Sequence, residues 1–265
     1  MITHYFGFTR KPFSKTVSSD EIFFWKDFEN LSRRLDYFLK EGGIFLLTGS
    51  IGSGKTTALR RFAASLNPNT HLVIYLAETF DRKREFYRTL LTQCGLAPSH
   101  LTCDCRSMLR KHILDLHVLK KQTPVFIIDE AQNLPAFLLE EVRLLSNFDF
   151  DSASPALFIL AGHKLLRQRI TFHENEALRQ RLSLKFHLEG LSLEETCAYI
   201  SHRLEKAGST GRIFADPVLA KIHEESTGIP RMINTICNSL LIASVIAEKK
   251  TIDESLFEKT KDEWR

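Results

Sequence analysis

The stretch Leu47–Thr57 reads LTGSIGSGKTT, and it decides the fold class that the sequence predicts. Four of its residues satisfy the pattern G-x-x-x-x-G-K-[ST]: Gly49, Gly54, Lys55 and Thr56. Glycines let such a loop curl so that successive backbone N–H groups converge on phosphate oxygens, and a following helix adds its positive N-terminal end. The apolar run Ile44–Leu47 predicts a buried strand before the loop, and the apolar spacing of Thr57–Leu66 predicts a helix after it. The stretch therefore indicates a site for a nucleoside triphosphate.

The pattern also gives a role to the polar groups of the loop. The ammonium of Lys55 can reach the β- and γ-phosphates, and the hydroxyl of Thr56 can bind Mg²⁺. The residues expected to contact the nucleotide are Gly49, Ser50, Gly52, Ser53, Gly54, Lys55, Thr56 and Thr57. The alternative interpretation is a Gly-Ser turn beside a stray lysine.

A second motif, Pro124–Ala131, follows about seventy residues later and reads PVFIIDEA. Its four consecutive apolar residues suit a central parallel strand that is covered on both faces. Asp129 then emerges at the carboxyl end of the strand, where open α/β sheets bind ligands, and can hold Mg²⁺. Glu130 is placed to polarise a water for attack on the γ-phosphate. A buried strand that ends in two acids is common alone, but the two motifs in this order indicate a site that hydrolyses a nucleotide.

The chain has 265 residues, enough to bury a sizeable core and to form one large domain or two. Its hydrophobic content of 43% and charged content of 26% are ordinary for a soluble globular protein. No apolar run approaches the length of a membrane span, and the N-terminus lacks the apolar segment of a secretory signal. The five cysteines form no CxxC pair, so we interpret them as reduced thiols, with a redox or metal fragment at Cys103–Cys105 as the alternative. We expect a cytoplasmic protein.

The net charge of +4 mildly favours an anionic partner, and the basic residues are clustered. The clusters are Arg82–Arg84 with Arg88, Arg106 with Arg110 and Lys111, and the span from Lys164 to Lys185. On charge alone, a solvated helix face is the alternative interpretation of each cluster.

Strands and helices alternate from residue 42 to about 187, which predicts an α/β fold with a mostly parallel sheet and helices on both faces. The predicted strands are 44–48, 72–77, 125–129, 157–161 and 185–188. The predicted helices are 28–40, 55–66, 82–94, 105–120, 135–146, 164–170 and 174–180. The residues before 28 read as an irregular leader rich in aromatic side chains.

From residue 191 onward the sequence predicts helices alone. Four positions carry helix-start signals: the capping box Ser192–Glu195, the pair Asp216–Pro217, Pro230, and Thr251–Glu254. We expect Asp216 to be an N-cap and Pro217 to be the first helical residue. The predicted parts are a leader and helix at 1–40, an α/β core at 41–190 and a small helical domain at 191–265.

This layout gives candidate roles to further residues. His163 ends the strand predicted beside the Asp129 strand, where it can sense the γ-phosphate or orient the water; an ordinary strand-end turn is the alternative. Arg231 begins a helix of the C-terminal domain and can fold back onto the phosphates; an exposed arginine is the alternative. An arginine at Arg179 or Arg181, just before the last core strand, can reach the nucleotide of a neighbouring subunit and stabilise the transferring phosphoryl group. Such a site is complete only between subunits, so we expect the nucleotide to drive oligomerisation.

Six motifs together resemble a known group of ATPases. They are Tyr5–Phe8 with Lys11–Phe13, Gly49–Thr57, Ile127–Gln132, Leu160–Gly162, Leu178–Arg181 and Thr227–Arg231. The chain resembles the AAA+ ATPases of the ExeA/GspA-like group, close to the TnsC, TniB and IstB-type ATPases of DNA transposition. The resemblance covers nearly the whole chain and implies a P-loop ATPase core, a small helical lid, and ATP with Mg²⁺ as cofactors.

The resemblance also implies a role for each matching residue. The roles are Walker A for Lys55 and Thr56, Walker B for Asp129 and Glu130, sensor 1 for His163, sensor 2 for Arg231, and arginine finger for Arg181, with Arg179 as the alternative. The group usually has glutamine where this chain has His163, which puts that sensor role in doubt because a histidine hydrogen bond varies with pH.

The resemblance leaves more than one biological process open. In the favoured interpretation, ATP assembles subunits into a ring or helical filament on duplex DNA, which then recruits and regulates a transposase. The segment Arg82, Lys83 and Arg84 would face the pore and contact the phosphate backbone without reading the base sequence. The alternatives are a general DNA-associated loader and an ExeA-type secretion ATPase. Proteins of the ExeA type continue into a membrane helix and a cell-wall-binding region, and we expect neither after Arg265.

Overall fold

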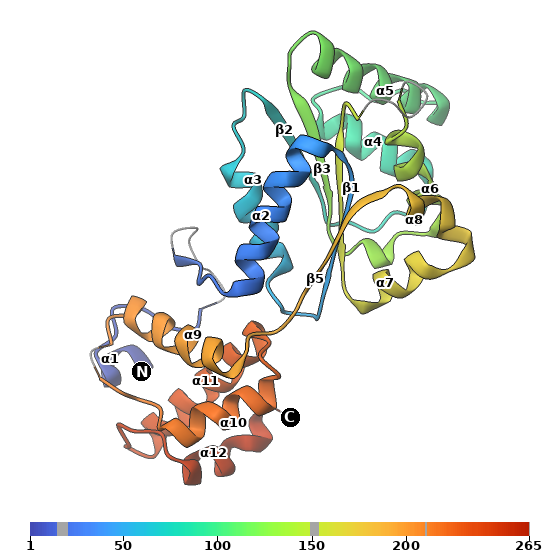
Figure 1. Ribbon diagram of the computed structural model, residues 1–265. Coiled ribbons are helices and arrows are strands. Elements are labelled where there is room, and N and C mark those ends of the chain that lie inside the picture. The colour runs from blue at the N-terminus through green and yellow to red at the C-terminus, as the bar shows by residue number, and fades with distance from the viewer. Residues whose placement is uncertain (15–20, 149–153, 210, 265) are drawn as a thin grey trace. The chain divides into compact units, whose positions relative to one another are not determined.

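The computed structural model describes residues 1–14, 21–148, 154–209 and 211–264, and a parallel five-stranded sheet dominates its larger part (Figure 1). The strands are β1 (Gly43–Gly49), β2 (His71–Leu76), β3 (Thr123–Ile128), β4 (Leu157–Gly162) and β5 (Leu182–Leu188). They lie in the order β2-β3-β4-β1-β5, and every neighbouring pair is parallel. The predicted α/β fold with a parallel sheet is therefore confirmed.

The chain divides into two compact units. The sheet unit comprises residues 28–49 and 55–188, and the helical unit comprises residues 1–27, 50–54 and 189–265. The sheet unit carries α2 (Lys26–Glu41, from residue 28), α3 (Lys55–Ser65), α4 (Lys83–Gln93), α5 (Thr102–Val118), α6 (Ala136–Leu145), α7 (Lys164–Thr171) and α8 (Glu176–Gln180). The helical unit carries α1 (Ile2–Phe6), α9 (Leu193–Lys206), α10 (Asp216–Ser226), α11 (Pro230–Ile246) and α12 (Glu254–Thr260).

The core of the sheet unit lies on both faces of the sheet, because side chains along a strand point alternately to the two sides. Leu46, Phe126 and Phe158 belong to a buried cluster that includes residues of α4, α5 and α6. The rings of Phe126 and Phe158 stack with centroids 4.9 Å apart. On the other face, Phe45 meets Phe38 of α2 edge to face. Figure 1 shows α2 and α3 on one side of the sheet and α4, α5 and α6 on the other. With both faces covered, a central strand such as β4 is buried along its whole length.

The strand register brings the carboxyl ends of β1, β3 and β4 to one edge of the sheet. Thr48 of β1 pairs with Gly162 of β4, and Ile128 of β3 pairs with Leu160 of β4. Asp129, directly after β3, therefore lies at the same edge as the end of β1 and the turn after β4. This is the edge at which parallel α/β sheets bind ligands.

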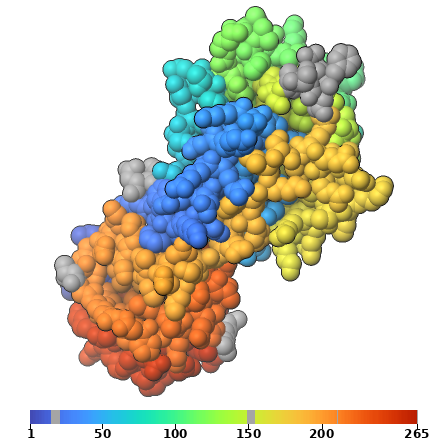
Figure 2. Space-filling view, in the orientation of Figure 1, coloured from blue at the N-terminus to red at the C-terminus, as the bar shows by residue number. Residues whose placement is uncertain are grey.

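The strand β5 is longer than the sequence predicted. It begins at Leu182 rather than Lys185, because Leu182, Leu184 and Phe186 alternate with more polar residues in the pattern of a half-buried edge strand. Arg34 of α2 lies over the ring of Phe186, 5.3 Å from its centroid. Figure 2 shows α2, in blue, beside β5, in gold, on the surface of the sheet unit.

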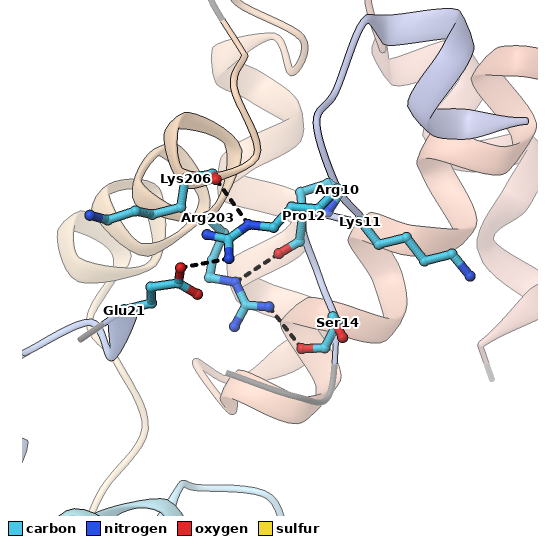
Figure 3. Close-up of a pocket in the computed structure, with 7 residues that line it drawn as sticks. All are labelled: Arg10, Lys11, Pro12, Ser14, Glu21, Arg203 and Lys206. Carbon is cyan, nitrogen blue, oxygen red and sulfur yellow. Dashed lines mark hydrogen bonds and ion pairs between the residues drawn. The ribbon is translucent and has the colours of Figure 1, made fainter. Parts of the chain in front are cut away.

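The N-terminal segment, residues 1–14, packs against the C-terminal helices within the helical unit. It contains the short helix α1, where the sequence predicted an irregular leader. The buried guanidinium of Arg203 donates to the main-chain oxygens of Pro12 and Ser14, each at 2.8 Å. Arg10 donates to the main-chain oxygen of Lys206 at 3.0 Å and pairs with Glu21 at 2.5 Å (Figure 3). These groups border a cavity of about 150 Å³.

Two of the four predicted helix starts of the helical unit agree with the sequence, and two differ. The N-cap of α12 is Asp253, whose carboxylate accepts from the N–H of Leu256 at 2.9 Å, and not Thr251 of the predicted capping box. Ser192 and Glu195 form the predicted capping box, with reciprocal bonds of 3.2 and 2.9 Å. The N-cap of α10 is Ala215 and not the predicted Asp216, which is already helical. The reason is that the N–H of Ala215 donates to the oxygen of Ile252, which holds Ala215 extended for one residue more. No helix in the described residues combines the length and the apolar character that a membrane span requires.

Candidate functional site

The loop after β1 contains two glycines that no other residue can replace without strain. Gly52 and Gly54 have φ angles of 84° and 101°, in the region that L side chains avoid. A Cβ on Gly52 would lie 2.6 Å from the Cβ of Arg231, and a Cβ on Gly54 would lie 3.2 Å from the ring of Trp25. Within the helical unit, therefore, these glycines allow both the curl of the loop and its close approach to two large side chains.

Lys55 and Thr56 begin α3 in the sheet unit, directly after this loop. Lys55 is buried, and its ammonium donates to the main-chain oxygen of Gly49 at 3.0 Å. The hydroxyl of Thr56 donates to Oδ2 of Asp129 at 2.7 Å. The structure thus brings together residues 73 positions apart that the sequence assigned to one Mg²⁺ site.

Asp129 accepts hydrogen bonds from three sides. In addition to Thr56, the phenol of Tyr75 on β2 donates to Oδ2 at 3.0 Å, and the N–H of Glu130 donates to Oδ1 at 2.9 Å. Burial and the negative charge of Asp129 raise the pKa of Tyr75 to about 12, so the phenol keeps its proton and stays a donor. The sequence analysis did not identify Tyr75. The only sequence signal was a side chain with a hydroxyl group within the otherwise apolar run of β2.

Gln132, in the turn after β3, connects Glu130 with the turn after β4 through two hydrogen bonds. Glu130 has a left-handed backbone, with φ of 52°, which is a strained conformation for a residue other than glycine. The side chain of Gln132 donates to Oε2 of Glu130 at 2.6 Å and accepts from the main-chain N–H of His163 at 3.2 Å. The ring of His163 caps α7 by accepting from the N–H of Leu165 at 3.4 Å. Gln132 is a second residue that sequence reasoning missed, although it lies within a quoted motif.

The candidate arginines lie in both units. Arg179 of α8 is half exposed and contacts the oxygen of Thr171 at 3.5 Å and the carboxylate of Glu176 at 3.8 Å. Arg181 follows α8, one residue before β5, as the sequence predicted. In the helical unit, Arg231 begins α11 with an exposed side chain, and its N–H donates to the oxygen of Gly52 at 3.3 Å.

The basic segment at the start of α4 is only partly available to a partner. Arg82 and Arg84 are exposed, but the ammonium of Lys83 pairs with Glu141 of α6 at 2.6 Å. Glu141 is almost fully buried and also pairs with Arg106 of α5 at 3.8 Å. Lys83 is therefore paired within the sheet unit, although 46% of its side chain is exposed, and its contact with DNA stays a prediction.

The second basic cluster is also partly structural. Arg110 of α5 donates to the main-chain oxygens of Leu144 and Asn147, each at 2.9 Å. Its guanidinium lies 4.4 Å from the centroid of the Phe148 ring. Arg110 thus closes the carboxyl end of α6, where unpaired carbonyls need donors.

The residues at this edge fit a magnesium nucleotide. The hydroxyl of Thr56 and the carboxylate of Asp129 are hard oxygen ligands of the kind Mg²⁺ prefers. The buried cation of Lys55 and the glycine curl suit a polyanion. Within the helical unit, the hydroxyl of Ser53 is fully buried and has no hydrogen-bond partner among the described residues, as expected of a donor that is left for a ligand.

Comparison with protein families and relatives places these motifs in context. Residues 39–170 match the AAA domain family. General secretion pathway protein A of Aeromonas hydrophila is 32% identical over 250 residues, which make up 92% of this chain and 45% of the relative. This chain therefore spans less than half the length of that curated relative.

Solved structures share the arrangement of strands and helices. The ORC2 protein of Aeropyrum pernix in ADPNP-ADP complexes has a TM-score of 0.66 at 17% identity, over 97% of this chain and 72% of its own. Cdc6p of Pyrobaculum aerophilum has a TM-score of 0.69 at 14% identity, and the match covers 95% of this chain and 70% of Cdc6p. Drosophila ORC bound to DNA has a TM-score of 0.63 at 16% identity, and the match covers 95% of this chain and 65% of the ORC chain. At these identities the likeness is one of fold.

Proposed function

Because this chain carries an AAA domain on the AAA+ P-loop NTPase fold, we propose that it binds ATP with Mg²⁺ and hydrolyses it to ADP and phosphate. The observation that supports the proposal most directly is the 2.7 Å hydrogen bond between Thr56 and Asp129. It joins the start of α3, after the glycine-rich loop, to the acidic end of β3. These are the two motifs whose side chains hold Mg²⁺ in P-loop enzymes.

Four side chains carry the chemistry in this proposal. Lys55 would neutralise charge on the β- and γ-phosphates, and Thr56 and Asp129 would hold Mg²⁺, whose positive charge would stabilise the negative charge of the nucleotide. Glu130 accepts a proton from the attacking water while the water oxygen bonds to the γ-phosphorus and the bond from phosphorus to ADP breaks.

The remaining candidates bind or sense the nucleotide. Arg231 and His163 respond to the γ-phosphate, and Arg181, with Arg179 as the alternative, acts on the nucleotide of a neighbouring subunit. The loop contacts the phosphates through Gly49, Ser50, Gly52, Ser53, Gly54 and Thr57. Each of these roles is a proposal for one residue and can be tested by itself.

For the process that hydrolysis serves, we propose a role of the kind played by a general secretion pathway ATPase. The support is the 32% identity with General secretion pathway protein A over 92% of this chain. Because the chain spans 45% of that relative, the proposal concerns the ATPase part, whose nucleotide state would drive self-assembly.

A second candidate is an ATPase that assembles on duplex DNA, either as a general loader or as a regulator of a transposase. The exposed Arg82 and Arg84 favour it, since both can contact a phosphate backbone. The solved Drosophila ORC, which is bound to DNA, shares the fold and adds support. The pairing of Lys83 with Glu141 counts against a three-residue contact.

The ATPase proposal is tested by two variants and a control. Lys55→Ala should weaken nucleotide binding by about 10- to 100-fold or more in calorimetry, because it removes charge-assisted bonds to the phosphates. Glu130→Gln should bind ATP with near wild-type affinity and turn it over much more slowly, since the amide keeps the shape and cannot accept the proton. Lys120→Ala, at an exposed lysine of the sheet unit, should match wild type in both. Wild-type turnover by Glu130→Gln would refute the assignment of the base.

Electron microscopy and salt titration separate the two processes. If DNA is the partner, ATP and duplex DNA together should give rings or filaments that neither gives alone. Replacing Arg82 and Arg84 by Ala should then lower the slope of log affinity against log salt, by nearly one unit for each DNA phosphate that the protein ceases to neutralise. Lys83→Ala should leave the slope unchanged. ATP-dependent assembly that is indifferent to DNA would support the secretion candidate.

A further inference from the structure

Gln132 is a buried side chain to which no sequence motif assigned a role. It lies in the short turn Ala131–Asn133, directly after Glu130, and is 8% exposed. Its Nε2 donates to Oε2 of Glu130 at 2.6 Å, and its Oε1 accepts from the N–H of His163 at 3.2 Å. Because a main-chain N–H can only donate, the amide fits in this orientation alone.

The fold leaves space for this amide and holds it from behind. A Cβ on Gly162 would lie 2.4 Å from Oε1 of Gln132 and 2.9 Å from Leu166, so glycine is required there for space. The guanidinium of Arg169 on α7 donates to the main-chain oxygen of Gln132 at 2.5 Å. Both ends of Gln132 are therefore tied to the β4–α7 region.

Glu130 is held by one carboxylate oxygen only. Oε2 receives the amide of Gln132, whereas Oε1 has no partner among the described residues, and the side chain is exposed. A carboxylate fixed by one oxygen has a restricted rotamer, and its second oxygen points in a defined direction toward solvent. A catalytic base needs this kind of orientation, because a misplacement of about 1 Å can reduce rate about 100-fold.

We propose that Gln132 is a positioning residue that orients Glu130 as the base and links it to the turn at His163. The inference rests on the proposed ATP hydrolysis. In the proposed site the turn at His163 lies beside the γ-phosphate. A change in that turn would move the N–H of His163, which donates to Oε1 of Gln132. The amide of Gln132 would then rotate, and its Nε2 would hold Glu130 in a different orientation. Gln132 thereby makes turnover depend on the state of the β4–α7 turn without touching the nucleotide.

The first test is Gln132→Met, which keeps the length of the side chain and removes both hydrogen bonds. We expect kcat to fall about tenfold or more, with KM and the calorimetric affinity for ATP within about twofold of wild type. Gln132→Glu, which cannot donate when ionised, should show the same split. Thermal unfolding without nucleotide shows which of the two variants is folded. One folded variant, Gln132→Met or Gln132→Glu, is enough for the test.

A double-mutant cycle tests whether Gln132 acts through Glu130. If it does, Gln132→Met should have no further effect on residual turnover in the Glu130→Gln background. A multiplicative loss in the double variant would overturn the proposal, because Gln132 would then act on something else. Turnover at the wild-type rate by Gln132→Met would also overturn it, while Lys55→Ala and Glu130→Gln still test ATP hydrolysis independently.

The link to the turn is tested by Gly162→Ala, which places a methyl carbon 2.4 Å from Oε1 of Gln132 and so forces that oxygen to move. We expect the same loss in kcat with Gln132 intact, and no change in ATP affinity. The matched control is Gly211→Ala, since a Cβ on Gly211 meets no atom within 4 Å. If Gly162→Ala leaves kcat at the wild-type value, the space at Gly162 is not needed and the link to the turn is wrong.

Discussion

Asp129 is the residue at which three elements of the sheet unit meet. Its carboxylate accepts from Thr56 at the start of α3, from Tyr75 on β2 and from the main chain of Glu130. A carboxylate with three donors is fixed in place before any cation arrives, and a Mg²⁺ ligand with that property loses little freedom on binding. The next residue, Glu130, has a left-handed backbone, which is strained for a residue other than glycine.

The loop glycines give a residue-scale prediction in three matched variants. Gly52→Ala introduces both a left-handed backbone strain and a 2.6 Å clash, Gly95→Ala introduces the strain alone, and Gly211→Ala introduces neither. We expect losses in the free energy of unfolding of about 2 to 4 kcal/mol, about 1 kcal/mol and near zero, in that order. Chemical denaturation measures all three. Equal losses for Gly52→Ala and Gly95→Ala would show that Arg231 moves aside at no cost.

At this scale, motif residues were predictable and their supporting residues were not. Lys55, Thr56 and Asp129 follow from local patterns, because a loop and a strand end each read directly from consecutive residues. Tyr75 and Gln132 depend instead on which strands are neighbours and in which register. That information lies in pairings between distant parts of the chain, which one sequence does not encode locally.

Among elements, α4, α5 and α6 share one buried carboxylate, Glu141. Lys83 and Tyr87 donate to it at 2.6 and 2.5 Å, and Arg106 pairs with it at 3.8 Å. Burial would raise the pKa of Glu141, but the bonds from Lys83 and Tyr87 and the charge of Arg106 outweigh it and hold that pKa below its ordinary value of 4.5. The ion cluster therefore favours the folded state when Glu141 is ionised.

This lowered pKa predicts a stability that depends on pH. A folded pKa below the unfolded one gives stability that is present above pH 4.5 and is lost as the pH falls through the folded pKa. Glu141→Gln should therefore cost about 2 kcal/mol at pH 7, and its difference from wild type should shrink as the pH falls below 4.5 and through the folded pKa. Glu140→Gln, at an exposed neighbour paired with Arg143, should cost less than about 1 kcal/mol. Denaturant titrations at several pH values measure both, and a pH-independent difference for Glu141→Gln would contradict the prediction.

Element types were predictable where the hydrophobic period was long, and less so at short or edge elements. The buried strands β1, β3 and β4 agree with their predicted ranges to within two residues at each end. The helix α1 has five residues, none of them buried, so it leaves no periodic pattern to read. The edge strand β5 is only half buried, and its alternation of apolar and polar residues begins at Leu182, three residues before the predicted start.

At the scale of the whole molecule, the helical unit is assembled from three separate parts of the chain. The segment 50–54, five residues of the glycine-rich loop, groups with residues 1–27 and 189–265 rather than with its sequence neighbours β1 and α3. The chain passes between the two units at residues 27–28, 49–50, 54–55 and 188–189, and two of these four crossings border the glycine-rich loop.

Self-assembly gives the prediction at this scale. If Arg181 acts across a subunit interface, Arg181→Ala should keep ATP affinity near wild type and lose the turnover that depends on assembly. Mixing it with Lys55→Ala subunits should restore part of the activity, because some interfaces then pair an intact loop with an intact arginine. Turnover measured against mixing ratio should pass through a maximum. No recovery in mixtures that demonstrably co-assemble would place the role of Arg181 within its own subunit.

The anchoring of the N-terminal segment by Arg10 and Arg203 has a consequence for biosynthesis. The hydrogen bond from Arg203 to Pro12 spans 191 residues, and that from Thr9 to Ala207 spans 198. At about 5 to 20 residues per second, a ribosome needs roughly 10 to 40 s to produce these partners after the segment itself. For that time Phe8 and Phe13, both buried in the finished protein, lack their C-terminal packing partners, such as Phe214 beside Phe13, and are open to chaperones. The sheet unit is complete by residue 188 and can fold first, so Phe8 and Phe13 reach their final contacts later than the sheet that follows them in the chain.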